Sequence, residues 1–100
     1  IKATVAGVVD TFGRLDILVY NAGRHWSAPP EDMPLSGWNK VMDVNLTGAF
    51  LAAREAAKPM LAAGRGAIVN VASTGGYQSF TPDVAEMACA PPQRRAGPRD

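Results

Sequence analysis

Two short apolar runs that lie far apart in the sequence constrain the fold more than any other feature. Turn-forming residues bound both runs, which are Ile17-Leu18-Val19-Tyr20 and Ala67-Ile68-Val69-Asn70-Val71-Ala72. Unbroken β-favouring runs of this length are typical of strands that are buried on both faces of a parallel sheet. Parallel strands need a long crossover, and residues 37–63 have a helical apolar period. The sequence therefore predicts an α/β fold with two neighbouring parallel strands of a doubly wound sheet.

The crossover helix is predicted to run over residues 37–63. Ser36 is the expected N-cap, and Gly64 is the expected C-terminal stop. Pro59 lies inside this span, and because proline removes a backbone hydrogen bond and collides with the preceding turn, a kink near Glu55 is expected.

The other segments are assigned by the same signals. Residues 1–12 carry apolar side chains at three- and four-residue spacing, and Gly13 ends this predicted helix. Three prolines make residues 24–35 a predicted loop. Residues 91–100 contain proline, glycine and arginine but no large apolar residue, so this tail is predicted to be disordered.

Composition excludes several classes of function. A formal net charge of +1 on 100 residues gives no electrostatic basis for binding nucleic acid or a membrane surface. No apolar run reaches the roughly 18 residues of a membrane-spanning helix. Cys89 is the single cysteine, so no internal disulfide or cysteine-based metal cage is possible, no metal site is predicted, and the expected location is cytoplasmic. Because 17 residues are alanine, the expected core is thin.

Small polar residues follow both predicted strands. Asn21-Ala22-Gly23 ends the first, and Ser73-Thr74-Gly75-Gly76 follows the second. Ligands of open parallel sheets bind beyond the carboxyl ends of the strands, where small residues admit a planar cofactor and a serine hydroxyl can bond a substrate carbonyl. Ordinary strand-ending turns are the alternative interpretation of either segment.

Asn45 is the third candidate. It lies four residues after Val41 and four before Ala49, which predicts that its amide faces the apolar side of the helix. An unpaired buried amide costs about 1 to 3 kcal/mol, so a specific partner such as a water or a disrupted helix carbonyl is expected. Nearby Gly48 can supply such a disruption. A purely structural amide within the core is the alternative.

Three segments occur together in this chain: Phe12-Gly13-Arg14-Leu15-Asp16-Ile17-Leu18-Val19-Tyr20-Asn21-Ala22-Gly23, then Trp38 with Val44-Asn45-Leu46-Thr47-Gly48, then Gly66-Ala67-Ile68-Val69-Asn70-Val71-Ala72-Ser73. Their order and separations resemble the middle of a short-chain dehydrogenase/reductase over about residues 1–85. The resemblance implies a partial Rossmann-type doubly wound parallel sheet, and hydride transfer between NAD or NADP and an alcohol or carbonyl substrate.

The same resemblance assigns roles to individual residues. Asn21, Ala22 and Gly23 match the Asn-Asn-Ala-Gly segment that lines the cofactor site, with Tyr20 in place of its first Asn. Asn45 matches the catalytic Asn whose kinked helix holds a water in a proton relay. Ser73 matches the Ser that orients and polarises the substrate oxygen. The helix over residues 37–63 matches one that often packs against a second subunit, which implies a homo-oligomeric parent enzyme.

Two family motifs have no match in this sequence. The family's general acid is a Tyr with a Lys four residues later, but near the expected position stand Glu86 and Met87, and Tyr77 has Thr81 four residues on. No glycine-rich phosphate loop follows a strand here. Since the chain starts with Ile1, it is expected to begin inside a longer reading frame.

These departures give two hypotheses about function. Residues 1–87 are predicted to be a central fragment of the oxidoreductase domain and residues 88–100 a disordered or out-of-frame tail, so this chain alone is expected to be inactive. The alternative is a non-catalytic fragment that associates with a full-length relative through the Ala-rich helix at residues 49–63. The substrate and the choice between NAD and NADP stay open.

Overall fold

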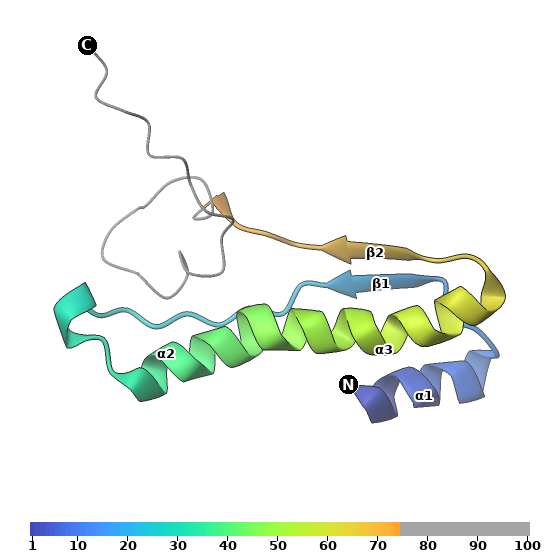
Figure 1. Cartoon of the computed structure of the whole chain (residues 1–100), viewed down its shortest axis with the longest axis horizontal. Helices are drawn as coiled ribbons and strands as arrows, with labels where there is room; N and C mark the ends of the chain where they lie inside the picture. Colours follow the sequence, from blue (N-terminus) through green and yellow to red (C-terminus); the bar gives the residue numbers. More distant parts are fainter. Residues whose placement is uncertain (75–100) are drawn as a thin grey trace, which may run out of the picture.

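The computed structural model of the chain describes residues 1–74, and Figure 1 shows their arrangement. Along the chain the elements are α1 (Lys2–Phe12), β1 (Ile17–Tyr20), the 3-10 turn η1 (Pro30–Asp32), α2 (Leu35–Met42), the π-helical turn η2 (Asp43–Thr47), α3 (Gly48–Ala63) and β2 (Ala67–Asn70). The predicted order of helix, strand, long helix and strand is confirmed. Predictions for residues 75–100, including the tail over 88–100, fall outside the described residues.

The two strands form a parallel pair, as predicted. Ile17 lies opposite Ala67 and Tyr20 lies opposite Asn70. Backbone hydrogen bonds continue on both sides of this register, from the Ala67 N–H to the Asp16 carbonyl at 2.9 Å and from the Val71 N–H to the Tyr20 carbonyl at 3.0 Å. The paired part of the second strand ends at Asn70, two residues before the predicted end at Ala72.

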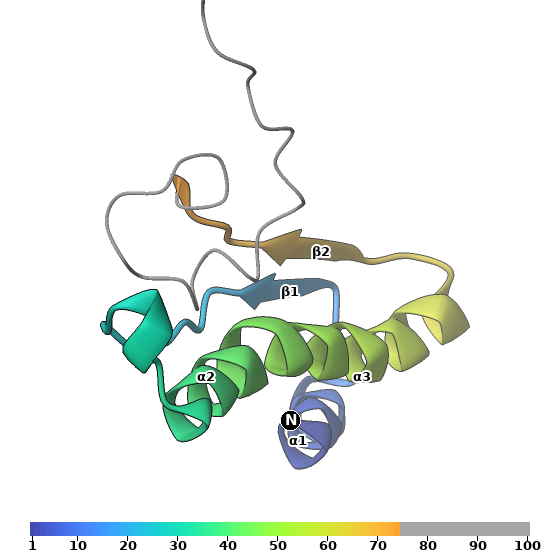
Figure 2. The same cartoon turned by 60° about the vertical axis from the view of Figure 1, so that its left-hand side comes forward.

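The prediction that both strands are buried on both faces is wrong for this chain. Ile17 and Val19 are 62% and 57% exposed, and every residue of β2 is exposed. The helices α2 and α3 run along one side of the strand pair in both views (Figures 1 and 2). Within residues 1–74 the sheet has only these two strands, and no described helix lies on its opposite face (Figures 1 and 2).

The long helix begins earlier than predicted. Pro34 is extended, with φ −70° and ψ 141°, and its carbonyl accepts a hydrogen bond from the Trp38 N–H at 3.0 Å. The first helical residue is therefore Leu35, and the prediction of Ser36 as N-cap is wrong because Ser36 already lies inside the first turn. No side-chain hydrogen bond caps this end, and the φ that the proline ring fixes agrees with the extended conformation before the helix.

The kink near Glu55 stays a prediction, and the structure shows a further irregularity at the start of the long helix. The helix α3 is continuous from Gly48 to Ala63 with Pro59 inside it, whereas the π-helical turn η2 separates α2 from α3. At its end the Gly48 N–H bonds to the Asp43 carbonyl, five residues back. The disruption expected beside Gly48 is therefore confirmed. Gly13 and Gly64 end α1 and α3 with positive φ angles of 79° and 72°, as predicted.

The core is thin, as the alanine content predicts. Within the described residues the buried apolar side chains are Val41, Ala52, Ala56 and Met60, all of them on α2 and α3. The helix α1 packs against α3 on the side away from the strands (Figure 2). None of the helices in residues 1–74 combines the length and the apolar character needed to cross a membrane.

Candidate functional site

The carboxyl ends of the two strands bring two of the candidate segments to one edge of the sheet. Because β1 and β2 are parallel and in register, residues 21–24 and residues 71–74 leave the sheet at the same edge. Figure 1 shows both segments continuing in the same direction beyond the arrowheads. We call residues 21–24 and 71–74 the site edge. Asn21, Ala22, Gly23 and Ser73 are all exposed there.

Asn45 is connected to the site edge by two hydrogen bonds. Its Oδ1 accepts from the Arg24 backbone N–H at 2.7 Å, and its Nδ2 donates to the Arg24 carbonyl at 3.0 Å. The expected specific partner is thus confirmed, but it is a loop backbone rather than a water or a helix carbonyl. Asn45 is half-buried within η2, where a π turn interrupts the four-residue spacing from Val41.

Tyr20 joins the end of β1 to the same turn. Its hydroxyl donates a hydrogen bond to the Val44 carbonyl. Gly48 lies beside this contact, since a Cβ atom added at Gly48 would overlap the Tyr20 hydroxyl oxygen. Tyr20 therefore fits against a helix position without a side chain.

The loop after the site edge is held at a second place. The ring of Trp26 lies against buried Gly37, and a Cβ added there would come within 2.7 Å of two ring carbons. Lys40 places its Nζ 5.3 Å from the centroid of the Trp26 ring, a cation–π distance. Asn45 and the start of α2 thus fix the path of the loop between them.

The segment Asn21-Ala22-Gly23 leaves its backbone open to a ligand. Among residues 1–74, no backbone hydrogen bond joins these three residues to another residue. Their side chains are small, and a Cβ added at Gly23 would lie 3.9 Å from Asn45 Oδ1, so the space beside the backbone is not filled. Exposed and unpartnered backbone groups between small side chains suit close approach by a planar ligand.

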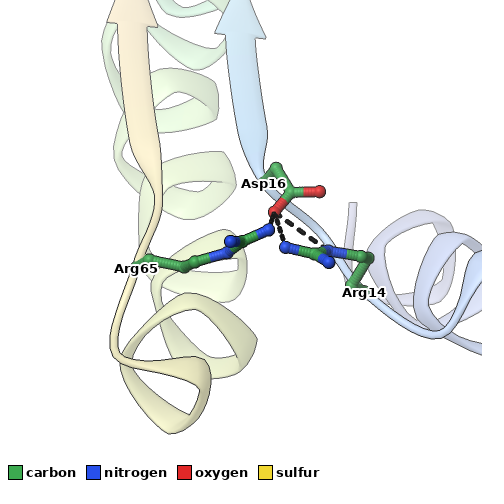
Figure 3. A network of polar contacts seen from close by, with 3 residues as sticks. All are labelled: Arg14, Asp16 and Arg65. Carbon is green, nitrogen blue, oxygen red and sulfur yellow. Dashed lines mark hydrogen bonds and ion pairs between the residues drawn. The ribbon is translucent and has the colours of Figure 1, made fainter.

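The opposite edge of the strand pair carries charges instead. Asp16 Oδ1 accepts from Arg14 Nε at 3.0 Å, from Arg14 Nη2 at 2.7 Å and from Arg65 Nη2 at 3.1 Å (Figure 3). These three residues precede the two strands, and we call them the entry edge. All three side chains are about half exposed. Within the described part of the chain, no group of three His, Cys, Asp or Glu residues is placed to hold a metal ion.

Sequence reasoning missed two of the contacts that shape the site edge. Arg24 takes part through its backbone, which carries no residue-type signal. Trp26 and Gly37 lie in a loop and in a helix, and the only hint is a glycine inside the helical pattern. Asn45 was found because an amide interrupts an apolar period.

Comparison with known proteins identifies the family. The family model for the short chain dehydrogenases matches residues 1–85. A 3-alpha-(or 20-beta)-hydroxysteroid dehydrogenase of Mycobacterium bovis is 47% identical over 74 residues, which are 74% of this chain and 28% of that protein. A D-threitol dehydrogenase of Mycolicibacterium smegmatis is 41% identical over 88 residues, which are 88% of this chain and 34% of the relative.

Solved structures show the same fold. A gluconate 5-dehydrogenase from Burkholderia cenocepacia, in complex with NADP and tartrate, matches with a TM-score of 0.83 and 32% identity over 88% of this chain and 34% of its own. ElxO with NADP bound matches with a TM-score of 0.82, 30% identity and coverage of 88% and 36%. The chain thus spans about a third of the length of these proteins, and its strand pair and helices form part of a Rossmann-type fold. The chain belongs to the short-chain dehydrogenase/reductase family.

Proposed function

We propose that this chain is the central part of an NAD- or NADP-dependent oxidoreductase that transfers hydride between the nicotinamide and an alcohol or carbonyl substrate in the cytoplasm. One observation carries the proposal: a parallel pair in register places the segments of Asn21 and Ser73 at one edge, and Asn45 is hydrogen-bonded to that edge. The family and the NADP-bound relatives support the chemistry.

The residues present fit a dinucleotide at the site edge. Asn21, Ala22 and Gly23 offer backbone groups that form no backbone hydrogen bond within residues 1–74, between side chains small enough for contact with a flat ring. In this proposal they lie against the cofactor. When bound, the cofactor supplies or accepts the hydride.

Ser73 and Asn45 have separate roles in the proposed chemistry. The Ser73 hydroxyl donates a hydrogen bond to the substrate oxygen and stabilises the negative charge that develops there. Asn45 holds the chain after Gly23 in place through Arg24, while η2 carries the water of a proton relay. An amide has two N–H donors and two acceptor lone pairs, so the bonds to Arg24 leave one of each for that water.

We expect the 100-residue chain alone to be inactive, because its sequence has no Tyr-x-x-x-Lys and no glycine-rich loop after a strand. The purified chain, mixed with NAD or NADP and a panel of primary and secondary alcohols, should produce no more reduced coenzyme than its Ser73→Ala variant. Turnover clearly above that variant would show that this part of the proposal is wrong.

The roles of individual residues are tested in a complete fold. Residues 1–74 replace the matching segment of the gluconate 5-dehydrogenase, so that the host supplies the rest of the domain and its own activity is measured. Ser73→Ala should lower kcat by about 100-fold, the typical effect of losing a donor to a developing oxyanion. Ser36→Ala, on the exposed first turn of α2, is the matched control.

Two outcomes of this experiment would contradict the proposal. The first is an active chimaera in which Ser73→Ala and Ser36→Ala have equal effects. The second is a chimaera that is folded and retains NADP but has no activity.

Asn45→Ala is compared with Asn39→Ala in the same host, since Asn39 is an exposed asparagine of α2.

A second candidate function is association through α3. Phe50 and Leu61 on this helix are 62% and 80% exposed, and Leu46 in η2 is 49% exposed. Such apolar exposure favours packing against another chain, either a second copy, as in a homo-oligomeric parent enzyme, or a full-length relative. Light scattering and thermal melts over a concentration series test this, and a concentration-independent monomer would contradict it.

A further inference from the structure

The contact between Tyr20 and Val44 joins the residues that precede two candidate site residues. Tyr20 comes directly before Asn21 at the end of β1, and Val44 comes directly before Asn45 in η2. The half-buried Tyr20 side chain crosses from the strand to the turn and donates its hydroxyl proton to the Val44 carbonyl. One side chain thus connects the strand end to the turn that carries Asn45.

The π turn explains why this carbonyl needs a donor. In an α-helix the Val44 carbonyl accepts from the N–H four residues on, which belongs to Gly48. Here the Gly48 N–H bonds instead to the Asp43 carbonyl. The ordinary partner of the Val44 carbonyl is therefore used elsewhere, and the Tyr20 hydroxyl supplies a donor at that place. A buried or half-buried carbonyl without a donor is costly, so this bond stabilises the π turn over a regular helix.

Gly48 makes the approach of Tyr20 possible. It is buried, and a Cβ atom added to it would overlap the Tyr20 hydroxyl oxygen, lie 3.3 Å from Tyr20 Cζ and lie 3.1 Å from the Asp43 carbonyl oxygen. Any larger residue would displace the hydroxyl from Val44. The tyrosine at the end of β1 and the glycine at the end of η2 are therefore structurally coupled, although 27 residues of chain lie between them.

We propose that Tyr20 is a positioning residue for Asn45. By donating to Val44, its hydroxyl holds η2 in the π-helical form, and this form directs the Asn45 amide to both backbone groups of Arg24. The significance of this for catalysis rests on the proposed function, but the positioning itself is measurable without any activity.

The experiment follows the side-chain NH2 signals of Asn45 in the isotope-labelled full chain by NMR. In Tyr20→Phe the ring remains and only the hydroxyl is lost. Exchange of the Asn45 Nδ2 protons with solvent should become about two- to tenfold faster, the range expected for losing one hydrogen bond of ordinary strength. Tyr77→Phe, at the chain's other tyrosine, is the matched control and should leave these signals unchanged.

A double-variant cycle distinguishes coupling from general loosening. Gly48→Ala should also speed exchange at Asn45, because its methyl group displaces the hydroxyl. The double variant Tyr20→Phe with Gly48→Ala should exchange no faster than Gly48→Ala alone, since both changes remove the same bond.

Three results would overturn the proposal. The first is that Tyr20→Phe leaves the exchange rate of the Asn45 Nδ2 protons unchanged, and the second is that the two substitutions have additive effects on this rate. The third is that these protons are not protected from exchange in the unsubstituted chain. If Asn45 responds as expected but Asn45→Ala and Asn39→Ala are equivalent in the chimaera, the positioning holds and only the proposed role of Asn45 fails.

Discussion

The two ends of the strand pair are held by different forces. At the entry edge, Asp16 binds two arginines through exposed ion pairs (Figure 3). At the site edge, the side chains of Asn45 and Tyr20 make neutral hydrogen bonds with backbone groups. Just beyond it, the Trp26 ring lies against Gly37 and 5.3 Å from Lys40 Nζ. Exposed ion pairs tolerate movement and are screened by salt, whereas hydrogen bonds to backbone atoms and close packing fix a geometry. The edge proposed to bind the cofactor and substrate is thus the more narrowly defined of the two.

The largest effect is expected from Gly37→Ala in α2, where the loop after the site edge is held. A methyl group there would lie within 2.7 to 2.9 Å of the ring carbons of Trp26, so the ring and the loop must move. Overpacking of this kind lowers the free energy of unfolding by about 1 to 3 kcal/mol. Urea unfolding measures this change.

Gly7→Ala in α1 is the matched control, because a Cβ there meets nothing within 4 Å. It should raise the free energy of unfolding by about 0.5 to 1 kcal/mol through the better helix propensity of alanine. Equal effects of the two substitutions would show that Trp26 does not rest on Gly37.

Asn45→Ala should have the next largest effect. It removes both hydrogen bonds to Arg24, at an expected cost of about 1 to 2 kcal/mol because the loop backbone is open to replacement by water. Asn39→Ala removes an exposed amide from the same helical segment and serves as the comparison. The difference in unfolding free energy between the two variants should persist at high salt, since the bonds are neutral, and a salt-dependent difference would break the contrast between the edges.

At the entry edge, Asp16→Asn should lower the free energy of unfolding by less than about 1 kcal/mol, because exposed ion pairs contribute no more than this. The difference from the unsubstituted chain should shrink between about 0.05 M and about 1 M NaCl, because salt screens the charges. Denaturant unfolding at both ionic strengths measures it. An effect of Asp16→Asn that is larger than that of Asn45→Ala, or that salt leaves unchanged, would contradict the contrast between the two edges.

The smallest expected effect concerns Glu55 in the middle of α3, away from both edges. A hydrogen bond from Lys58 lowers the pKa of this carboxyl below its ordinary value, opposed by burial and helped by the charges of Lys58 and Arg54. Since the folded-state pKa is the lower one, the stabilisation is present above the ordinary value of 4.5 and is lost as the pH falls through the folded pKa.

The unfolding free energies of Glu55→Gln and the unsubstituted chain should therefore differ at about pH 6 and converge towards about pH 3. Urea unfolding at a series of pH values measures this. A difference that grows on acidification would mean that the Lys58 contact at 2.7 Å does not stabilise the charged carboxylate.

Much of the fold follows from local signals. The two apolar runs predicted the strands, and the helical period between them predicted the parallel pairing, which the register of Ile17 opposite Ala67 confirms. The predicted start of the long helix was wrong. Ser36 was chosen because serine is a common N-cap, but the carbonyl of extended Pro34 already accepts the first hydrogen bond of the helix.

Less of the candidate site was predictable. Asn21-Ala22-Gly23 and Ser73 were placed at one edge by the strand pattern, and their roles stay predictions. The partner of Asn45 was not foreseen, since Arg24 bonds through atoms that every residue has. Tyr20 was noted as a departure from the family, but its contact with Val44 depends on how the strand and the helix pack.

The sequence by itself determined where the backbone extends, where it coils and where glycine ends a helix, because these depend on the preferences of residues close together in the chain. Only the tertiary structure decided that the disruption expected beside Gly48 is a π turn over Asp43–Thr47, and which backbone groups Asn45 and Tyr20 meet. Those outcomes arise from bonds and close packing between segments more than 20 residues apart, and no local preference specifies them.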